Sequence, residues 1–338
     1  MNIIPPKQAI VAIQNDKIVA LPTETVYGLF GLGNSSKSVA QVYKIKNRPA
    51  DNPLICHFHS FEQILSHTIN QPEYLAILVD NFCPGPITFL LELNPCSDLQ
   101  PATAGQVRIC CRIPDNIQTL EILKEINIPL FGPSANSSTR VSGTNCEIIF
   151  ADLGDKIVGI VDGGECEVGL ESTIIDCSAK DVIKILRPGA IGKTEIEKVL
   201  NNQNIKIIEN QASDKTTPGA KYRHYSPTTK IVRTEKTVIQ INDTEIINSP
   251  EIKYILGFEE DLSTLPNSIQ KINLGSVSIP NEIAHNLFQK LFDIDKLNQE
   301  MIYFYFGSNA EKLFLSESSI EKAIVNRLDK IFTSNNET

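Results

Sequence analysis

The pattern that most constrains this fold is a series of short apolar segments, spaced like β-strands, that alternate with helical segments over the first 205 residues. Because several strand segments follow one another without a helix between them, the order predicts an α/β domain with a mixed, twisted sheet and flanking helices. Strands are predicted at KIVAL, NPLICHF, ITFLLEL, QVRICCRIP, PLFGPSAN, KIVGIVDGG, STIIDCS and VIKILRPGAI. Helices are predicted at 6–15, 35–43, 60–80, 115–126, 145–152 and 193–201.

This periodicity stops in the segment ASDKTTPGAKYRHYSPTTK, which carries two prolines and a concentration of basic residues. Beyond it, KYILGF, MIYFYF and the helical EIAHNLFQKLFDIDKL predict a smaller, Rossmann-like α/β domain. A chain of 338 residues exceeds the usual size of one core, so two domains are expected. We therefore predict a first domain over 1–208, a linker over 209–229, a second domain over 230–333 and a flexible tail over 334–338.

The composition excludes several classes of protein. A formal net charge of -9 argues against broad, nonspecific nucleic-acid binding but leaves room for a local anion site. No apolar run approaches the roughly 20 residues that cross a bilayer. The eight cysteines include no CxxC pair and no Cys/His cluster at zinc spacing, which favours a reduced, mostly buried set. The expectation is a soluble, cytoplasmic protein.

The stretch VYKIKNRPADNPLICHF concentrates cations in this acidic chain. Lys46 and Arg48 stand two residues apart, and Pro49 keeps Arg48 out of the helical conformation, so both side chains can leave a helix end together. Such a pair suits a triphosphate. The alternative is a solvated helix C-terminus, where basic side chains meet the helix dipole favourably, and the stretch taken alone favours this alternative.

Two polar turns offer further candidates. FGPSANSSTRVSGT follows a strand with hydroxyls and amides that suit phosphates or a base. The motif taken alone favours the alternative of an ordinary turn that satisfies its own backbone. In PTETVYGL, Glu24 has the chemistry of a general base, a metal ligand or a surface acid, while Thr23 and Thr25 have that of turn caps. Neither a P-loop nor a dinucleotide fingerprint is present.

Several polar residues lie at strand ends. Arg112 stands in a strand otherwise made of isoleucine and cysteine, so it needs an anionic partner, either a structural carboxylate or a substrate carboxylate. His57 ends another strand, and GLESTIID places Ser172 at the start of a third. A shared cleft would require this placement. Five residues lie at a strand end or in the turn beside it, namely Thr25, His57, Arg112, Ser134 and Ser172.

Taken together, these motifs resemble the YrdC-like domain of the threonylcarbamoyl-AMP synthase family. The resemblance rests on PTETVYGL, Lys46-Asn47-Arg48 followed by PADNPL, Ser134-Ala135-Asn136, GLESTIID and RPGAI at 187–191, in fitting order over 5–205. The linker PGAKYRHYSP is similar to the signature of the long, two-domain form of the family. Two positions depart from the family pattern, namely Ala220, where methionine is usual, and Arg108, where a small hydroxyl residue is usual.

The resemblance implies a nucleotidyltransferase that joins L-threonine, bicarbonate and ATP into threonylcarbamoyl-AMP and releases pyrophosphate. The product would serve the threonylcarbamoyladenosine modification of tRNA. A separate transfer complex would act on the tRNA itself, so neither tight tRNA binding nor a membrane partner is expected. Mg²⁺ would arrive on the ATP phosphates, and no protein-held metal is expected.

The resemblance also implies roles for individual residues. Lys46 and Arg48 correspond to the catalytic cations around the ATP phosphates. The other residues implied at ATP are Asn52, Arg108, Ser134, Asn136, Ser142, Arg187 and Tyr225. Those implied at threonine are Thr25, His57, Arg112, Gly132 and Ser172. A lid over the cleft would contain Lys221, Tyr222, Arg223, His224 and Tyr225.

Two alternative functions use the same cations. One is a noncatalytic RNA-binding module, which predicts salt-sensitive RNA binding without ATP turnover. The other is a different enzyme that forms a carbamoyl-adenylate, for which acylphosphatase-like and zinc-finger-like regions would be expected. The chain lacks the cysteine clusters of the latter regions.

Overall fold

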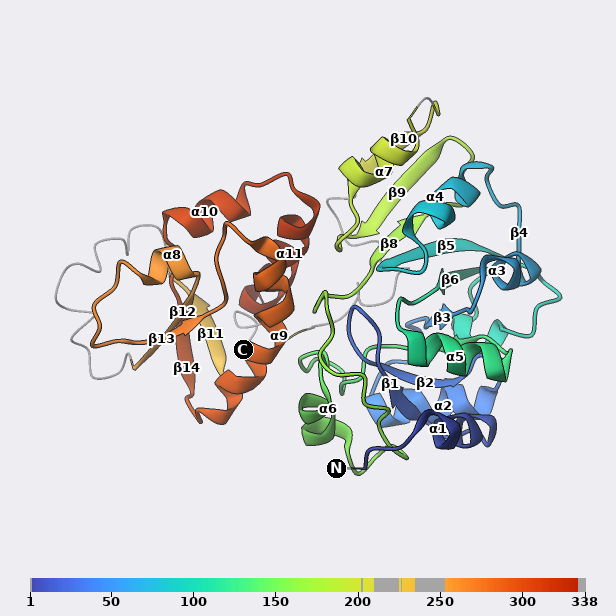
Figure 1. Ribbon diagram of the computed structural model, residues 1–338, viewed down its shortest axis with the longest axis horizontal. Helices are drawn as coiled ribbons and strands as arrows, with labels where there is room; N and C mark the ends of the chain where they lie inside the picture. The colour runs from blue at the N-terminus through green and yellow to red at the C-terminus, as the bar shows by residue number, and fades with distance from the viewer. Residues whose placement is uncertain (1, 202, 210–224, 226, 235–252, 334–338) are drawn as a thin grey trace. The chain divides into compact units, whose positions relative to one another are not determined.

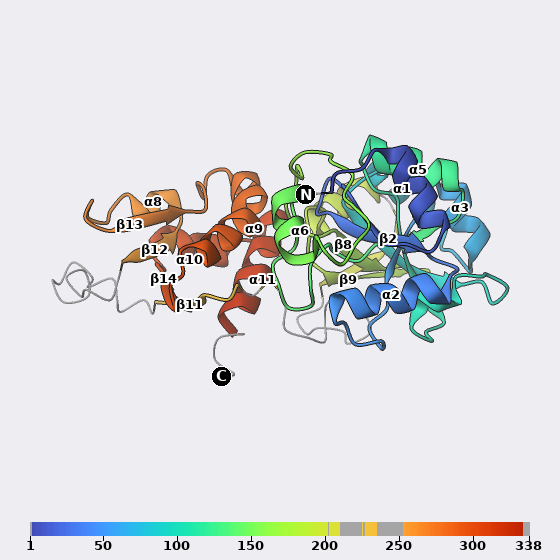
Figure 2. The ribbon, with the colours of Figure 1, turned by 90° about the horizontal axis from the view of Figure 1, so that it is seen from below.

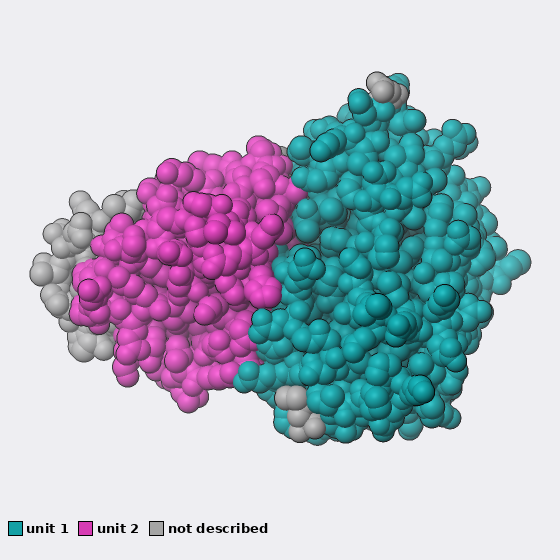
Figure 3. Space-filling model, in the orientation of Figure 1, with its two compact units in different colours: residues 1–138, 142–222 teal, residues 139–141, 223–338 magenta. Residues whose placement is uncertain are grey.

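The structure is a computed structural model that describes residues 2–201, 203–209, 225, 227–234 and 253–333. It divides into two compact units, residues 1–138 with 142–222 and residues 139–141 with 223–338 (Figure 3). Most of the predicted linker, including Ala220, and the predicted tail lie outside the described residues.

The first unit contains a ten-stranded mixed sheet with the path β1-β2-β7-β3-β6-β5-β8-β9-β10 and with β4 paired to β5 (Figure 1). The pairs β3–β6, β5–β8 and β9–β10 are parallel, whereas β5–β6 and β8–β9 are antiparallel. This confirms the predicted mixed sheet. The strands are β1 Val19–Leu21, β2 Gly28–Leu32, β3 Ile55–His57, β4 Thr68–Ile69, β5 Ile87–Leu93, β6 Arg108–Arg112, β7 Leu130–Phe131, β8 Thr173–Asp176, β9 Val182–Arg187 and β10 Lys206–Glu209.

Helices flank the sheet because successive side chains of a strand point to opposite faces. In β1, Val19 and Leu21 are buried in a cluster with residues of α1 and α5, whereas Ala20 belongs to a larger cluster with residues of α2 and α4. Figure 1 shows these helices around the sheet, and Figure 2 shows α1, α2 and α5 from below. The helices are α1 Pro6–Gln14, α2 Ser36–Lys46, α3 Phe61–His67, α4 Tyr74–Phe82, α5 Ile117–Ile126, α6 Cys146–Leu153 and α7 Lys193–Val199, with a 3₁₀ turn at Gln100–Thr103.

Three local predictions were wrong or incomplete. KIVGIVDGG forms no strand, and Ile160 makes only isolated bridges, to Ile3 and to Ala20. The backbone is close to the N-terminal segment here, since a Cβ on Gly159 would lie 2.8 Å from Ile4. The single helix expected over 60–80 is two helices, since β4 and Pro72 separate α3 from α4. Strand β2 has no counterpart among the predicted strands.

The second unit is a smaller α/β structure, as predicted. Its four strands have the order β11-β14-β12-β13, and every pair is parallel. Phe304 of β14 packs edge-on against Phe258 in the core, with ring centroids 5.6 Å apart. The elements are β11 Lys230–Arg233, β12 Tyr254–Gly257, α8 Glu259–Leu262, β13 Gln270–Asn273, α9 Pro280–Lys296, β14 Met301–Phe304, α10 Ser308–Phe314 and α11 Ser319–Thr333.

Candidate active site

Lys46 is the last residue of α2, and its side chain turns into the protein. Asn47 ends the helix in the left-handed conformation (φ 50°). The Lys46 ammonium is buried and donates hydrogen bonds to the carbonyl oxygens of Ser134 and Asn136. The alternative of a solvated lysine at a helix end is therefore wrong for Lys46.

The surroundings of Lys46 disfavour its positive charge. Burial, together with the positive charge of Arg48, holds the pKa of the Lys46 ammonium well below its usual value. Two of its three N–H groups meet backbone carbonyls, which leaves the third for an anionic oxygen. Half-buried Arg48 donates to the carbonyls of Asn52 (3.3 Å) and Pro53 (3.0 Å), so it braces the turn that follows α2.

The Ser/Asn turn after β7 is held from three elements. Next to β2, the Ala135 N–H donates to the Tyr27 carbonyl at 2.7 Å. At α2, the Ser138 N–H donates to the Lys46 carbonyl at 2.7 Å. On α6, the Asp152 carboxylate accepts from both the N–H and the hydroxyl of Ser137, at 2.6 and 2.7 Å. Sequence reasoning missed Asp152, because an acid on a helix surface is ordinary.

His57 and Arg112 lie side by side because β3 and β6 pair in parallel, with these two residues in register. Both side chains are buried, and the His57 ring lies 4.8 Å from the ring of Phe30. Burial, with the neighbouring charge of Arg112, lowers the pKa of His57 well below its usual value, so the imidazole is neutral at pH 7. Gly132 allows this packing, since a Cβ there would lie 2.8 Å from the ring.

The turn after β7 joins the two predicted groups of residues. Gly132, at its start, packs against His57, and Ser134, two residues later, accepts a hydrogen bond from Lys46. The residues implied at threonine and the cation implied at the ATP phosphates therefore meet along one short segment. Of the strand-end residues that the sequence assigned to a shared cleft, His57, Arg112 and Ser134 thus lie on adjoining segments.

Glu24 and Arg112 form a buried ion pair, with 2.8 Å between Glu24 Oε2 and Arg112 Nη2. The surface-acid interpretation of Glu24 is therefore wrong. Its neighbour Thr25 is also buried, and the Thr25 hydroxyl lies 2.9 Å from that of Thr23. The turn PTET thus packs its polar side chains inward, toward the end of β6.

Ser172 belongs to a second buried network. Its hydroxyl lies 2.8 Å from that of Thr88 on β5. Thr88 is near Arg112, because Phe89, which follows Thr88 in sequence, pairs between β5 and β6 with Cys111, which precedes Arg112. Arg187 donates to the Ser172 carbonyl (2.9 Å) and hydroxyl (3.1 Å). The adjoining Glu171 carboxylate accepts from the buried Ser142 hydroxyl at 2.7 Å. Ser142, Ser172 and Arg187 are thereby brought together, and Thr88 is a partner that the sequence did not indicate.

Buried polar atoms without a hydrogen-bond partner are concentrated at these residues. Among the described residues they include Glu24 Oε1, Asn52 Oδ1, His57 Nδ1 and Arg112 Nε. Folded proteins satisfy the great majority of buried polar groups, so an unsatisfied cluster needs an explanation. A polar ligand that completes these bonds supplies one.

Arg108 and Tyr225 lie apart from this cluster or outside its unit. Arg108 begins β6, about 13 Å from Arg112 at the rise of a strand, and pairs with Asp176 at 2.9 Å. Tyr225 belongs to the second unit, where its ring stacks on Phe288 with 5.3 Å between centroids. The other predicted lid residues lie outside the described residues.

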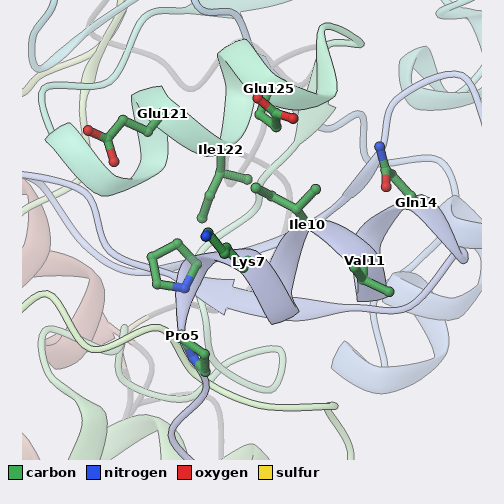
Figure 4. Close-up of a pocket in the computed structure, with 9 residues that line it drawn as sticks. Pro5, Lys7, Ile10, Val11, Gln14, Glu121, Ile122 and Glu125 are labelled. Atoms are coloured by element: carbon green, nitrogen blue, oxygen red, sulfur yellow. The ribbon is translucent and has the colours of Figure 1, made fainter.

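A groove of about 810 Å³ lies elsewhere in the first unit, between α1 and α5 (Figure 4). Ile10 and Ile122 contribute apolar surface to it, and Lys7, Glu121 and Glu125 line it with charge. None of the predicted site residues lines this groove, so we do not assign the site to it.

The described residues contain neither a metal-binding cluster nor a membrane-spanning helix. No group of three or more His, Cys, Asp or Glu side chains there is arranged to hold a metal ion. In the same part of the chain, no helix combines the length and apolar character needed to cross a bilayer.

Comparison with known proteins gives matches to both units. Residues 11–189 match the Sua5/YciO/YrdC family model, described as telomere recombination. Residues 191–330 match the model of the threonylcarbamoyl-AMP synthase C-terminal domain. A solved structure of P. abyssi Sua5 complexed with L-threonine matches with a TM-score of 0.83 at 32% identity, covering 98% of this chain and 94% of that chain.

Curated relatives agree with these matches. The threonylcarbamoyl-AMP synthase of Bacillus subtilis is 39% identical over 222 residues, which cover 65% of this chain and 64% of that protein. The threonylcarbamoyl-AMP synthase of Pyrococcus abyssi is 33% identical over 334 residues, which cover 94% of this chain and 91% of that protein. The chain therefore belongs to the threonylcarbamoyl-AMP synthase family, in the form that carries both the YrdC-like and the C-terminal domain.

Proposed function

We propose that this chain is a nucleotidyltransferase that makes threonylcarbamoyl-AMP and pyrophosphate from L-threonine, bicarbonate and ATP. The observation that carries the proposal is the buried cluster of unsatisfied polar atoms at Glu24, His57 and Arg112, beside a turn whose carbonyls hold the ammonium of Lys46. The cluster of Glu24, His57 and Arg112 suits a small zwitterion, and the Lys46 ammonium suits a polyphosphate. The complex of P. abyssi Sua5 with L-threonine supports the choice of zwitterion.

L-Threonine binds at the strand ends. Arg112 holds its carboxylate through charge-assisted hydrogen bonds, and neutral His57 offers a ring nitrogen to a polar group of the substrate. Thr25, Gly132 and Ser172 complete the predicted pocket. Because these groups are buried, the amine reacts away from bulk water.

ATP binds at the turn and the end of α2. Lys46 and Arg48 stabilise the negative charge on the phosphates, and Asn52, Ser134, Asn136, Ser142 and Arg187 contact the nucleotide. Mg²⁺ comes with the ATP phosphates. The two acids nearest the site have partners in the protein, since Glu24 faces Arg112 and Glu171 accepts a hydrogen bond from Ser142. This supports the proposal that the phosphates, and not the protein, hold the Mg²⁺.

The reaction has two bond-forming steps. The threonine amine, after losing a proton, attacks the carbon of bicarbonate, and loss of water gives a carbamate. A carbamate oxygen then attacks the α-phosphate, the bond to the β-phosphate breaks, and pyrophosphate leaves. The protein contributes position, dehydration and positive charge.

The product goes to a separate complex that transfers the threonylcarbamoyl group to tRNA, so this chain needs no tight tRNA site. We place the reaction in the cytoplasm. All eight cysteines are free, and five of them are buried, which supports a reducing compartment.

The test is a pyrophosphate-release assay with ATP, run with and without L-threonine and bicarbonate. Release should depend on both, and Lys46→Ala should lower it at least about a hundredfold, because a buried charge at the phosphates is lost. Lys44→Ala, which changes an exposed lysine of the same helix, is the matched control and should be unchanged. Near-normal turnover by a folded Lys46→Ala protein would refute the proposal. Salt-sensitive RNA binding without turnover would favour the noncatalytic alternative.

A further inference from the structure

Both the backbone and the carboxylate of Glu24 accept hydrogen bonds from backbone N–H groups. Its backbone carbonyl accepts from the Val168 N–H at 2.8 Å, and its Oε2 accepts from the Asp115 N–H at 3.1 Å. The hydroxyl of Thr23 accepts from the N–H groups of Thr25 and Val26, the two residues that follow Glu24, at 3.2 Å each. The carboxylate is thus fixed at one oxygen while the other, Oε1, is buried and without a partner.

Arg112 faces Glu24 with matching unused groups. Its Nη2 lies 2.8 Å from Glu24 Oε2, but this contact is an ion pair by distance only, because the N–H is not aligned for a hydrogen bond. Its Nε and Nη2 therefore both lack a hydrogen-bond partner. These two nitrogens share one edge of the guanidinium, which is the edge that pairs with both oxygens of a carboxylate.

The Asp115 carboxyl also interacts with this pair of side chains, since burial and then the charge of Glu24 raise the pKa of Asp115. The Cys83 and Cys166 thiols feel the charges of Glu24 and Arg112, but burial raises the pKa of each to about 12, so both are neutral at pH 7. The groups that lack a hydrogen bond are thus Nε and Nη2 of the cation, of which Nη2 lies 2.8 Å from Glu24 Oε2, and Oε1 of the anion. An amino-acid zwitterion carries the complementary set on adjacent atoms.

We propose that Glu24 is a further substrate-binding and catalytic residue, whose Oε1 accepts a hydrogen bond from the α-ammonium of threonine while Arg112 holds the carboxylate. The inference rests on the proposed function and adds a role to it. The nitrogen must lose a proton before it attacks bicarbonate, and Glu24 Oε1 takes that proton, so an N–H bond breaks as an O–H bond forms. Water released as the carbamate forms then carries the proton away.

The role predicts how the site discriminates between ligands. 3-Hydroxybutanoate has the carboxylate and hydroxyl of threonine but no ammonium, so it leaves Glu24 Oε1 unsatisfied. The wild-type protein should therefore bind it much more weakly than L-threonine, by about tenfold or more. In Glu24→Gln the acceptor loses its charge and Arg112 loses its counter-ion, so threonine binds more weakly and 3-hydroxybutanoate binds better.

The experiment is calorimetric titration of the full-length protein with L-threonine, 3-hydroxybutanoate and ATP. We expect Glu24→Gln to bring the two affinities within about threefold of each other, while the Kd of ATP changes less than about twofold. Glu167→Gln, an exposed acid on the segment that contacts the Glu24 backbone, is the matched control and should keep the wild-type discrimination. Glu24→Asp, which retains the charge, should show part of the wild-type discrimination between L-threonine and 3-hydroxybutanoate.

The outcomes separate this inference from the proposed function. A wild-type protein that does not bind L-threonine overturns both. A wild-type protein that binds threonine and 3-hydroxybutanoate equally well overturns the role of Glu24 alone, and this arm needs no variant to fold. Unchanged discrimination in Glu24→Gln likewise overturns it. Loss of discrimination in Glu24→Gln with partial recovery in Glu24→Asp supports it.

Discussion

At the residue scale, burial of the neutral His57 ring links stability to pH. Burial, then the charge of Arg112, lowers the pKa of this ring well below 6.5, whereas the unfolded chain titrates near 6.5. As the pH falls below 6.5, the unfolded state therefore binds a proton that the folded state does not bind. His57 thus contributes stability that is present above pH 6.5 and is lost as the pH falls toward its folded-state pKa.

We therefore expect the free energy of unfolding to fall between about pH 6.5 and pH 5, with a contribution from His57 of up to about 1.4 kcal/mol per pH unit. His57→Gln removes this contribution, so the stability difference between wild type and variant should shrink on acidification. Urea denaturation at a series of pH values measures this difference in the free energy of unfolding. His59→Gln, a half-buried histidine two residues later, serves as control. Parallel curves for wild type and His57→Gln would contradict the argument.

The sequence indicated the residue types of the site better than their partners. Lys46 and Arg112 stood out because charged residues in apolar or helix-end contexts need an anion. The partners Asp152, Thr88 and Glu24 are distant in sequence from the groups they contact, and only the sheet order and the turn after β7 bring them there. Arg108 is a further example, since its partner Asp176 lies on β8, which is separated from β6 by β5 in the sheet.

At the element scale, α2 fixes where Lys46 lies. The Ser35 hydroxyl caps the helix by accepting from the Ser38 N–H at 3.2 Å, and it also donates to Asp16 at 2.5 Å. Ser35→Ala should therefore lower the free energy of unfolding by about 1 kcal/mol. Because the hydrogen bonds of Lys46 remain, pyrophosphate release well below the unfolding temperature should be unchanged.

The neighbouring exposed Ser36, the first residue of α2, gives the control for this prediction. Ser36→Ala should change stability by less than about 0.5 kcal/mol, since it removes no cap. Chemical denaturation of both variants measures the difference. Equal effects of the two substitutions would show that Ser35 does not act as the cap.

Helices and strands with a regular apolar pattern were predictable from the sequence. Strand β2, in which a glycine lets a neighbouring side chain pack against the backbone, was not. Helix α2 begins at a Ser cap and was predicted from it, and β5 and β6 follow their apolar patterns. Strand β2 was missed because Gly28 and Gly31 interrupt its pattern. Gly31 is required by packing, since a Cβ there would lie 2.5 Å from the Phe131 ring on β7. Sequence periodicity carries no information on such a contact.

At the scale of the whole molecule, each unit has a hydrophobic cluster of its own among the described residues. The large clusters of the sheet draw only on residues up to Ile207, and the cluster of Ile255, Leu262 and Tyr305 draws only on the second unit. Two domains followed from chain length and from the loss of periodicity after 209. The exact division did not, because residues 139–141 group with the second unit despite their position in the chain.

This separation predicts that residues 1–209 fold without the rest of the chain. Such a protein keeps the complete sheet, whose last described strand, β10, pairs in parallel with β9. It also keeps the clusters that bury Phe30, Phe89 and Phe131. We expect a single cooperative thermal transition by calorimetry, with far-ultraviolet circular dichroism typical of an α/β domain. A broad, noncooperative transition would show that the second unit is needed for folding.

A shorter protein that ends at Leu200 is the matched control. It lacks β10, so the edge of β9 loses its partner and the main cluster loses the side chain of Ile207. An unpaired strand edge also favours association between chains. The shorter protein should therefore unfold at a lower temperature than residues 1–209 and aggregate more readily on heating. If both proteins unfold alike, β10 contributes nothing to the first unit, and the division between the units lies earlier in the chain.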